Sequence, residues 1–460
     1  SVILTMAQES GALAYLERRM ETRSPASQNI VFPEDKGFDL IAQLEGVTLP
    51  WRTKYKKAGT VRFELDEEYT PYPREMQIGR FVTPGSFIYA DTNQQQRKSL
   101  CQVFALADHR IKSLDRIWIN GKLERSTPLV HGQRTLQRVE NDKGEDRCWV
   151  TFFDGRPDQV ADPFLVSVAS TWTSAHRLRG VAYIIVEHRW DSDMANAYDY
   201  RFGGEGGYFY DRRQDSTAGG SGTQRWDQPL TWGYTTNAAV ISDHYRSGIR
   251  VIAGADHLWF GVGEALDAVP YAEFEALADL CDENVTLKAG GTQKRYEVNG
   301  TLSAKNSHDK NLQKLADQMA ARVIDQGGRI SFRPPVVRTP VVTLTDADLI
   351  RDSESSIDTG GRIDDMVNTI EGRFVNPAND YKNDDYPKVQ VEDYVDKDNG
   401  EVSDTLNFDL EISAERAQRI AKLKIEDSRR ILVLTETYGT KAKAIEPGEW
   451  FVRESALRGF

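Results

Sequence analysis

Histidine and cysteine, the residue types best suited to metal binding or nucleophilic catalysis, are scattered in this sequence. No two histidines are spaced i, i+4, and none has a cysteine or second histidine at metal-ligand spacing. The seven are His109, His131, His176, His188, His244, His257 and His308. Each of the three cysteines, Cys101, Cys148 and Cys281, lies in an apolar run, which predicts reduced core residues over a disulfide or metal role. The sequence therefore predicts no metal centre and no catalytic cysteine.

Two glycine-rich stretches fall short of known catalytic or nucleotide-binding motifs. Residues 219–223 (GGSGT) lack the second glycine of G-x-S-x-G and lie in a polar stretch, which predicts a linker and not a nucleophile elbow. Residues 261–266 (GVGEAL) lack the third glycine of a dinucleotide fingerprint, and the sequence contains no P-loop lysine motif. We expect no nucleotide cofactor.

The acidic stretch at residues 396–401 (DKDNGE) has the composition of a calcium loop. Counting back from Gly400 as the sixth position places Val395 at the first, where a carboxylate is required. A solvated loop is therefore favoured over a cation site at Asp396 and Asp398, although the alternative stays open. Carboxylate pairs for glycoside hydrolysis are defined in space, so sequence spacing does not test them, and nothing here favours them.

Strands must position most residues of the first half of the chain. Apolar alternation dominates residues 60–188, and residues 148–152 and 180–186 are the clearest strands. A strand ends at Asn120-Gly121, a dipeptide that accepts positive φ at both central turn positions, which predicts a β hairpin. We expect a β domain over residues 61–190.

The segment before this domain is weakly patterned. A short helix is conceivable at residues 12–20, and residues 24–37 are polar and rich in turn formers. We interpret residues 1–60 as an extension that docks on a neighbour.

Helices enter in the next segment, residues 191–335. A mobile loop is expected at 191–228, which holds two Gly-Gly pairs and the run STAGGSG. Capping residues and apolar spacing predict helices at 237–245, 270–281 and 312–323, the last ended by Gly327-Gly328, with strands at 294–302 and 329–332. This order indicates an α+β domain.

The chain then returns to strands. We expect them at residues 336–344, 366–375 and 431–437, with an acidic, turn-rich excursion at 376–413 and one helix capped by Ser413. Residues 336–460 are therefore interpreted as a second β domain with one helix. The predicted fold class is α+β, predominantly β.

Composition limits the function classes. The 460 residues suit roughly three domains of about 150 residues each. A net charge of −12 argues against a wide nucleic-acid-binding face. No apolar stretch reaches the ~18 residues that span a bilayer, and the first residues lack a signal-peptide pattern, so we expect synthesis in a cytoplasm.

Several short motifs occur in a fixed order along the chain. They are the IWINGKL hairpin (117–123), WDQP (226–229), YAEFEALADLCDE (271–283), RYEVNG (295–300), VTLTDAD (342–348), NTIEGRFVNPANDYKNDDYP (368–387) and IEPGE (445–449). This order resembles the tail tip or baseplate hub proteins of long-tailed bacteriophages and gene transfer agents, the lambda tip attachment protein J family. The resemblance runs from about residue 73 to the C-terminus.

The resemblance implies a structural role without catalysis or cofactors. Such proteins form a homotrimeric ring at the distal end of the tail, in which two tube-like β domains per chain match a sixfold tube. Expected partners are the distal tail protein or tube end, tail fibre or spike proteins, and the tape measure protein. DNA is expected only in transit, and the smaller α+β domain would decorate or close the ring.

Two stretches concentrate positive charge, residues 51–57 (WRTKYKK) and 416–430. One of them could line the DNA exit path, but a helix face that balances the protein's own acids is the favoured interpretation. The net charge predicts no measurable DNA affinity of the purified protein at physiological salt.

Two other functions remain as alternatives. A spike-base hub subunit of a contractile injection machine has the same composition, and only partner genes would separate the two. A protein that binds or cleaves cell-envelope glycans is suggested by nine tryptophans, eighteen tyrosines and many acids.

Overall fold

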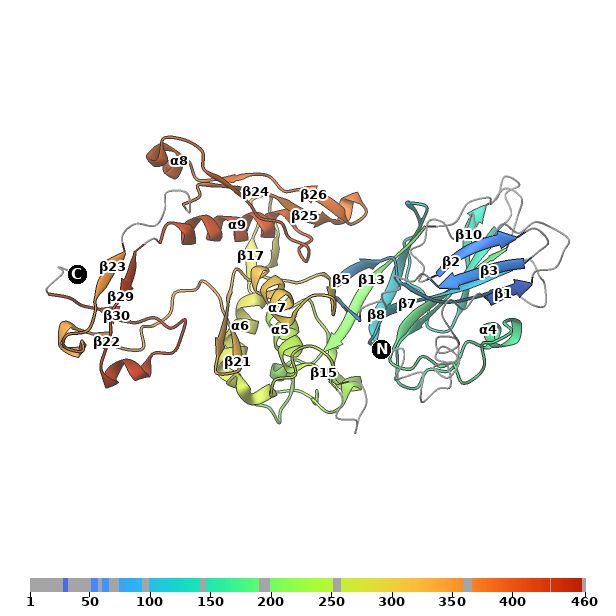
Figure 1. Ribbon diagram of the computed structural model, residues 1–460, viewed down its shortest axis with the longest axis horizontal. Helices are drawn as coiled ribbons and strands as arrows, with labels where there is room; N and C mark the ends of the chain where they lie inside the picture. Colours follow the sequence, from blue (N-terminus) through green and yellow to red (C-terminus); the bar gives the residue numbers. More distant parts are fainter. Residues whose placement is uncertain are drawn as a thin grey trace.

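The computed structural model describes residues 74–92, 99–140, 146–189, 199–250, 258–358, 366–430 and 432–456, together with three strands nearer the N-terminus. Those strands, β1 (Gln28–Val31), β2 (Trp51–Lys56) and β3 (Thr60–Leu65), form one antiparallel sheet in the order β1-β3-β2. The helix considered at residues 12–20 lies outside the described residues. The fold is α+β and predominantly β, as predicted, and its parts follow one another along the longest axis in Figure 1.

A β sandwich forms one end of the molecule. Its first sheet runs in the order β10 (Arg134–Glu140), β11 (Asp146–Asp154), β12 (Ala182–Arg189), β7 (Ser99–Ala107) and β6 (Ser86–Thr92), all antiparallel. Its second sheet runs in the order β14 (Gly233–Tyr234), β13 (Tyr200–Phe209), β8 (Ile111–Ile119) and β9 (Lys122–Arg125), and β5 (Arg80–Thr83) also pairs with β13.

The first sheet is buried on both faces. Because side chains alternate along a strand, Phe104 and Ile184 point into the sandwich, whereas Val103 and Tyr183 lie in a second core that contains α4 (Pro163–Val168). A strand of a sheet that is covered on both faces has a nearly continuous run of apolar residues, and every residue of β7 is buried.

The predicted hairpin at Asn120-Gly121 is confirmed. Asn120 has φ 51° and Gly121 has φ 77°, and they join β8 to β9. Positive φ at both positions is the geometry that lets a two-residue turn follow the twist of the paired strands.

The mobile loop predicted at residues 191–228 is wrong for its described part. The two Gly-Gly pairs at 203–204 and 206–207 lie inside β13. A Cβ on Gly204 would stand 2.0 Å from the Ser113 carbonyl oxygen, and one on Gly206 would stand 2.4 Å from that of Gln77. These glycines therefore permit close strand contact and do not provide flexibility.

The linker predicted around residues 216–222 is also wrong. Its backbone is hydrogen-bonded into a compact turn: Gly220 N–H donates to Asp215 O at 3.0 Å, and Ser221 N–H donates to Arg213 O at 2.9 Å. A Cβ on Gly220 or Gly222 would collide with the backbone of Arg213 or Gln214. Small residues are required here because two chain segments lie in contact.

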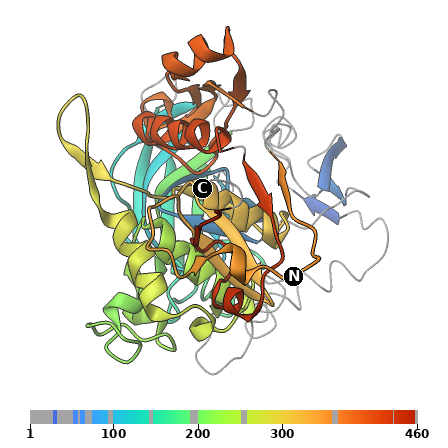
Figure 2. The same cartoon turned by 90° about the vertical axis from the view of Figure 1, so that its left-hand side faces the viewer.

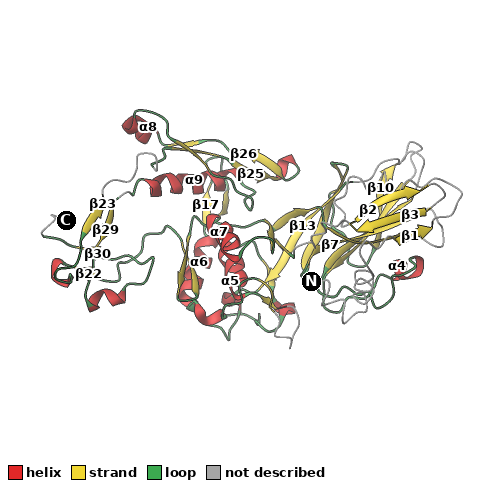
Figure 3. Cartoon of the chain, viewed as in Figure 1, coloured by secondary structure: helices red, strands yellow, loops and turns green. Residues whose placement is uncertain are grey.

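Helices occupy the centre of the molecule, as Figure 3 shows. The predicted α5 (Ala238–Ser247) begins at Asn237, whose side chain accepts hydrogen bonds from two backbone N–H groups, and ends at Gly248, with φ 83°. The predicted α6 (Tyr271–Asp282) buries Phe274, Ala278 and Cys281 on one face. Both predictions are confirmed.

The third central helix is shorter than predicted. The helix α7 (His308–Asp317) stops before the sequence reaches Val323, and Ala320 has a left-handed φ of 48°. The residues that follow form a hairpin of β20 (Arg322–Gln326) and β21 (Arg329–Arg333). Gly327-Gly328 is therefore a hairpin turn and not the end of the helix, because Val323 pairs with Phe332 across the hairpin.

One apolar core joins the central helices to parts of both chain halves. The strand β4 (Glu75–Ile78) pairs with β19 (Gly300–Ser303) and contributes Met76 and Ile78. The helix α9 (Ala414–Ser428), capped by Ser413 as predicted, adds Ile420 and Ile425 to the same core. The core therefore continues past residue 335.

The region 336–460, predicted as a second β domain with one helix, contains short ladders and, in its described part, two α-helices. Its first ladders are β24 (Thr369–Glu371) between β27 (Val389–Gln390) and β28 (Ser403–Thr405), and β25 (Arg373–Asn376) with β26 (Lys382–Asp385). The unpredicted helix is α8 (Glu392–Asp398). In Figure 2, α8 and α9 lie together on one side of the molecule.

In the same region, β22 (Thr343–Leu344) pairs in parallel with β30 (Val452–Arg453), and β23 (Ser356–Asp358) pairs antiparallel with β29 (Val433–Thr435). The strand predicted at 336–344 thus shrinks to two residues, because the ladder it joins is only two residues long.

The remaining short elements are β15 (Ile249–Arg250), β16 (Leu258–Phe260), β17 (Asn284–Thr286) and β18 (Thr292–Lys294). The 3-10 helices are η1 (Arg212–Gln214), η2 (Pro229–Thr231), η3 (Leu266–Ala268), η4 (Asp346–Asp348), η6 (Pro377–Asn379) and η7 (Thr440–Ala444). Within the described part of the chain, no helix combines the length and apolar character needed to cross a membrane.

Candidate functional site

A small lobe at the C-terminal end of the molecule has an unusual distribution of side chains. This terminal lobe consists of residues 336–358 and 432–456, which contain β22, β23, β29, β30, η4 and η7. Leu344 is the single large apolar side chain that is buried among the described residues of the lobe. Ladders of two strands are only marginally stable in water, so the lobe lacks the core that would hold it by itself.

The apolar side chains of the terminal lobe lie on its outside. Fourteen large apolar side chains are exposed in the described chain, and eight of them belong to this lobe: Val337, Val341, Ile350, Leu432, Val433, Trp450, Phe451 and Val452. Scattered exposed apolar residues are ordinary, but such a concentration in one small unit marks a surface that another molecule covers.

Polar contacts hold the interior of the terminal lobe. The Arg453 guanidinium donates to Glu436 Oε2 at 2.8 Å and to Asp346 Oδ1 at 2.7 Å, and the side chains of Arg453 and Glu436 are only 7% and 1% exposed. The Tyr438 hydroxyl also donates to Glu436, and Ser455 Oγ donates to Asp346 Oδ1 at 2.8 Å. Hydrogen bonding from Arg453 lowers the pKa of Glu436 to about 2.

This arrangement suits association better than chemistry. Arg453 is engaged with Asp346 and Glu436 inside the lobe, whereas eight large aliphatic or aromatic side chains are exposed. Each ladder also leaves one edge of its strands open, and a partner strand could extend it by main-chain hydrogen bonds. The terminal lobe is therefore the candidate functional site, as a binding surface.

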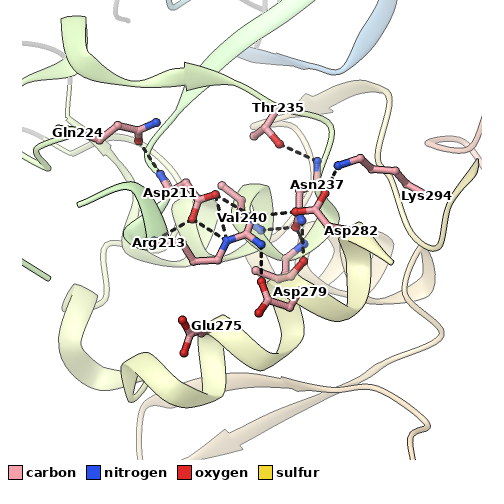
Figure 4. Close-up of polar contacts among 12 residues, drawn as sticks. Asp211, Arg213, Gln224, Thr235, Asn237, Val240, Glu275, Asp279, Asp282 and Lys294 are labelled. Carbon is pink, nitrogen blue, oxygen red and sulfur yellow. Dashed lines mark hydrogen bonds and ion pairs between the residues drawn. The ribbon is translucent and has the colours of Figure 1, made fainter. Parts of the chain in front are cut away.

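A cluster of charged side chains lies in the central part and is shown in Figure 4. Arg213 pairs with Asp211, with Asp279 at 2.7 Å and with Asp282 at 2.9 Å, and Lys294 also contacts Asp282. Burial disfavours the charged form of Asp282, but hydrogen bonds from Lys294 and Arg213 outweigh it and lower the pKa of Asp282. The cluster joins η1, α6 and β18, so we interpret it as structural.

A cysteine and a histidine that are distant in sequence meet inside the sandwich. Cys148 Sγ lies 3.5 Å from His188 Nε2, because β11 and β12 pair these two residues, and the Tyr200 hydroxyl hydrogen-bonds to the same nitrogen. All three side chains are buried. Burial raises the pKa of the Cys148 thiol and lowers the pKa of His188 to about 3, so the pair is neutral and carries no nucleophile. Sequence spacing gave no sign of this contact.

The other cysteines and histidines also have structural surroundings. Cys101 and Cys281 are buried and free, as predicted. His109 accepts a hydrogen bond from the Gln77 backbone at 2.9 Å, and burial lowers the pKa of His109 to about 4. His131 contacts Asp154 at 2.8 Å, whereas His257 lies outside the described residues. No group of three His, Cys, Asp or Glu side chains in the described chain is placed to hold a metal ion.

The acidic stretch at 396–401 is largely exposed to solvent, as predicted, but its first half belongs to a helix and not to a loop. Residues 392–398 form α8, and Asn399, with φ 56°, ends it. Asp398 accepts hydrogen bonds from Arg429 at 2.9 Å and from Asn368 at 2.8 Å, and these bonds lower the pKa of Asp398 to about 2. A carboxylate engaged in this way is part of the fold.

Most of the basic stretch at 416–430 lies on α9, and two of its arginines pair with the protein's own acids. Arg416 contacts both Glu411 and Glu297, and Arg429 contacts Asp398. This geometry matches the favoured interpretation of that stretch. The other basic stretch, residues 51–57, coincides with β2, and its side chains are not described.

The C-terminal third of the chain matches a known family. Residues 307–458 match the family model described as "Putative phage tail protein", and this segment contains α7, α9 and the whole terminal lobe. The match identifies a phage-tail-type segment in this protein. No curated protein matches the chain in sequence.

A solved structure from the "Virion of native gene transfer agent (GTA) particle" is similar over 78% of this chain and 73% of its own chain. The sequence identity is 16% and the TM-score is 0.46. The two structures differ too much for this likeness to bear on function.

Proposed function

We propose that this protein is a structural hub of a phage tail tip or baseplate, in which three copies form a ring that joins the end of the tail tube to fibre or spike proteins. The observation that carries the proposal is the match of residues 307–458 to a phage tail family. The order of the motifs from the IWINGKL hairpin to IEPGE, which resembles hub proteins, supports the finer assignment.

The architecture suits a protein whose role is to hold other proteins together. The terminal lobe offers an exposed apolar surface, and the sandwich ends in strands paired on one side only. Open strand edges give affinity through main-chain hydrogen bonds without distinctive side chains. We therefore assign the protein a structural role and no catalytic step.

The proposed partners follow from the position in the tail. The distal tail protein or tube end would lie on one side of the ring, fibre or spike proteins on the other, and the tape measure protein within reach of the axis. DNA would pass the ring only during ejection, which agrees with a net charge of −12 and with the pairing of Arg416 and Arg429 by acids.

Electron microscopy of intact particles tests the proposal directly. A small tag placed after residue 460 is expected to give density around the tail axis at its distal end, in a copy number divisible by three. Particles assembled without this chain are expected to lack that ring, and complementation with the untagged chain is the control. Density along the tail shaft, in the head or off the axis would refute the hub assignment.

A further inference from the structure

Exposed apolar side chains gather at a second place, at the far end of the molecule. Outside the terminal lobe, six large apolar side chains are exposed in the described chain, and four of them belong to the sandwich. Three of these lie on β9, on β10 or between them: Leu123, Val130 and Leu136. We name residues 122–137 the sandwich edge.

The sandwich edge is an open border of both sheets. In the described chain, β10 pairs only with β11, and β9 pairs only with β8. The two strands contact each other through side chains, since Arg125 Nε donates to Gln137 Oε1 at 3.0 Å and Gln137 Nε2 donates to the Glu124 carbonyl at 2.7 Å. Two neighbouring strand edges with exposed apolar residues form a site at which another chain can add.

Charge distinguishes the two surfaces. The terminal lobe carries nine carboxylates against five basic side chains, whereas the sandwich edge carries three basic side chains against one carboxylate. Opposite net charges steer two surfaces together and disfavour contact of either surface with itself. The terminal lobe therefore complements the sandwich edge better than it complements a second terminal lobe.

One copy cannot join its own two surfaces. Figure 1 places the terminal lobe, with β22, β23, β29 and β30, and the strand β10 at opposite ends of the longest axis, with the central helices between them. Complementary surfaces at opposite ends of a molecule produce a head-to-tail contact between copies, and such contacts close into a ring when the rotation between copies allows it.

We propose that the terminal lobe of one copy binds the sandwich edge of a second copy of this chain. The exposed side chains of the lobe, Leu432 and Val433 on and beside β29 among them, cover Leu123, Val130 and Leu136 of the neighbour. The inference rests on the proposed function only in that several copies act together, and it names the surfaces through which they do so.

Mixing two damaged proteins tests the contact. One variant, Leu432→Glu with Val433→Glu, alters the lobe, and the other, Val130→Glu with Leu136→Glu, alters the sandwich edge. Their matched control is Leu230→Glu, because Leu230 is 65% exposed and lies on η2, which belongs to neither surface. Mass is measured by sedimentation equilibrium or light scattering up to about 100 µM, a range that detects weak contacts.

A head-to-tail contact gives a distinctive result. The unaltered protein and the Leu230→Glu control are expected to form oligomers, and each double variant is expected to be monomeric. An equimolar mixture of the two double variants should form 1:1 dimers and nothing larger, because the mixture retains one intact lobe and one intact edge per pair. An unaltered protein that stays monomeric at about 100 µM, a mixture that stays monomeric, or a control that also dissociates overturns the proposal.

A charge exchange at exposed residues tests the same contact independently, in case the double variants misfold. Lys122 of the edge is 78% exposed in its side chain, and Glu354 of the lobe is exposed. Lys122→Glu alone and Glu354→Lys alone are each expected to weaken association at least about threefold, and a mixture of the two should recover it more fully at low salt. Equal association of all four samples contradicts the proposal.

The outcome is separable from that of the proposed function. Mixing reports on the purified protein, whereas the position of the ring is measured on particles. If the two double variants do not associate but the protein lies around the tail axis, the contact alone is refuted. If they associate but the protein lies elsewhere in the particle, the hub assignment alone is refuted.

Discussion

The β sandwich and the terminal lobe place their apolar side chains in opposite ways. The sandwich covers both faces of its first sheet with apolar side chains, in two separate cores. The terminal lobe buries Leu344, gathers charged residues such as Arg453 and Glu436 inside, and exposes aliphatic and aromatic side chains. We therefore expect the sandwich to hold its shape through its own cores and the lobe to gain stability against a partner.

The largest expected effect is the difference in stability loss when a side chain is shortened in each of the two regions. Phe104 is 2% exposed and contacts Phe87, Tyr200 and Phe202, so Phe104→Ala should lower the free energy of unfolding by about 3 to 5 kcal/mol. Leu432→Ala in the lobe, at a site 62% exposed, should cost less than about 0.5 kcal/mol in the isolated chain. Urea denaturation measures both. Equal losses of unfolding free energy in the two variants would contradict the proposed difference between the sandwich and the lobe.

A second change tests whether the sandwich depends on its glycines. Gly204→Ala would force a Cβ to within 2.0 Å of the Ser113 carbonyl, so we expect β8 and β13 to separate locally, at a cost of about 1 to 3 kcal/mol. Gly233→Ala is the control, since its nearest neighbour is the end of the flexible Gln224 side chain at 3.1 Å. Thermal unfolding compares them. A mobile segment would tolerate both changes equally.

A third change tests the polar interior of the terminal lobe. Glu436→Gln removes the charge that Arg453 and Tyr438 contact, and should destabilise the lobe by about 2 kcal/mol while the sandwich is unchanged. Hydrogen exchange should quicken at β29 and β30 but not at β7. Because the folded pKa of Glu436 is lowered to about 2, the unaltered lobe should also loosen as pH falls from about 4.5 toward that value. The variant should lack this acid response.

The smallest expected effect lies between the two regions, in the shared core. Burial raises the pKa of Glu411 to about 7, although Arg416 opposes the shift. A raised folded pKa means that the stabilising contribution is present below about 4.5 and is lost as pH rises through about 7. We expect a decline on the order of 1 kcal/mol across this window, absent in Glu411→Gln. Stability that rises over the same window would contradict the expected sign.

Local rules predicted the elements that depend on neighbouring residues. Asn237 and Gly248 bound α5, Ser413 caps α9, and Asn120-Gly121 turns the hairpin, because caps and tight turns are fixed by side chains within a few residues. The same rules failed where a distant strand decides. Val323 continues a helical pattern in sequence, but its pairing with Phe332 makes it part of a strand.

The candidate site was beyond prediction for a related reason. Leu432 and Val433 look like any strand in sequence, and only the structure shows that nothing in the described chain covers them. The glycines of β13 led to the wrong prediction of a mobile loop. Glycine is suited both to flexible segments and to strands in close contact, so its presence alone does not distinguish them. Exposure of apolar residues and close approach of backbones are both properties of the fold, and spacing along the chain does not contain them.

The pairing of β4 with β19 and the reach of the central core impose an order of events during synthesis. All strands of the sandwich except the two residues of β14 have been synthesised once Phe209 is made, but Met76 and Ile78 must wait for Leu302 and finally for Ile425. Strands β29 and β30 follow Ile425 in the chain. The terminal lobe is thus completed after the residues of the central core have been made, so a nascent chain cannot offer its lobe to a neighbour before that stage.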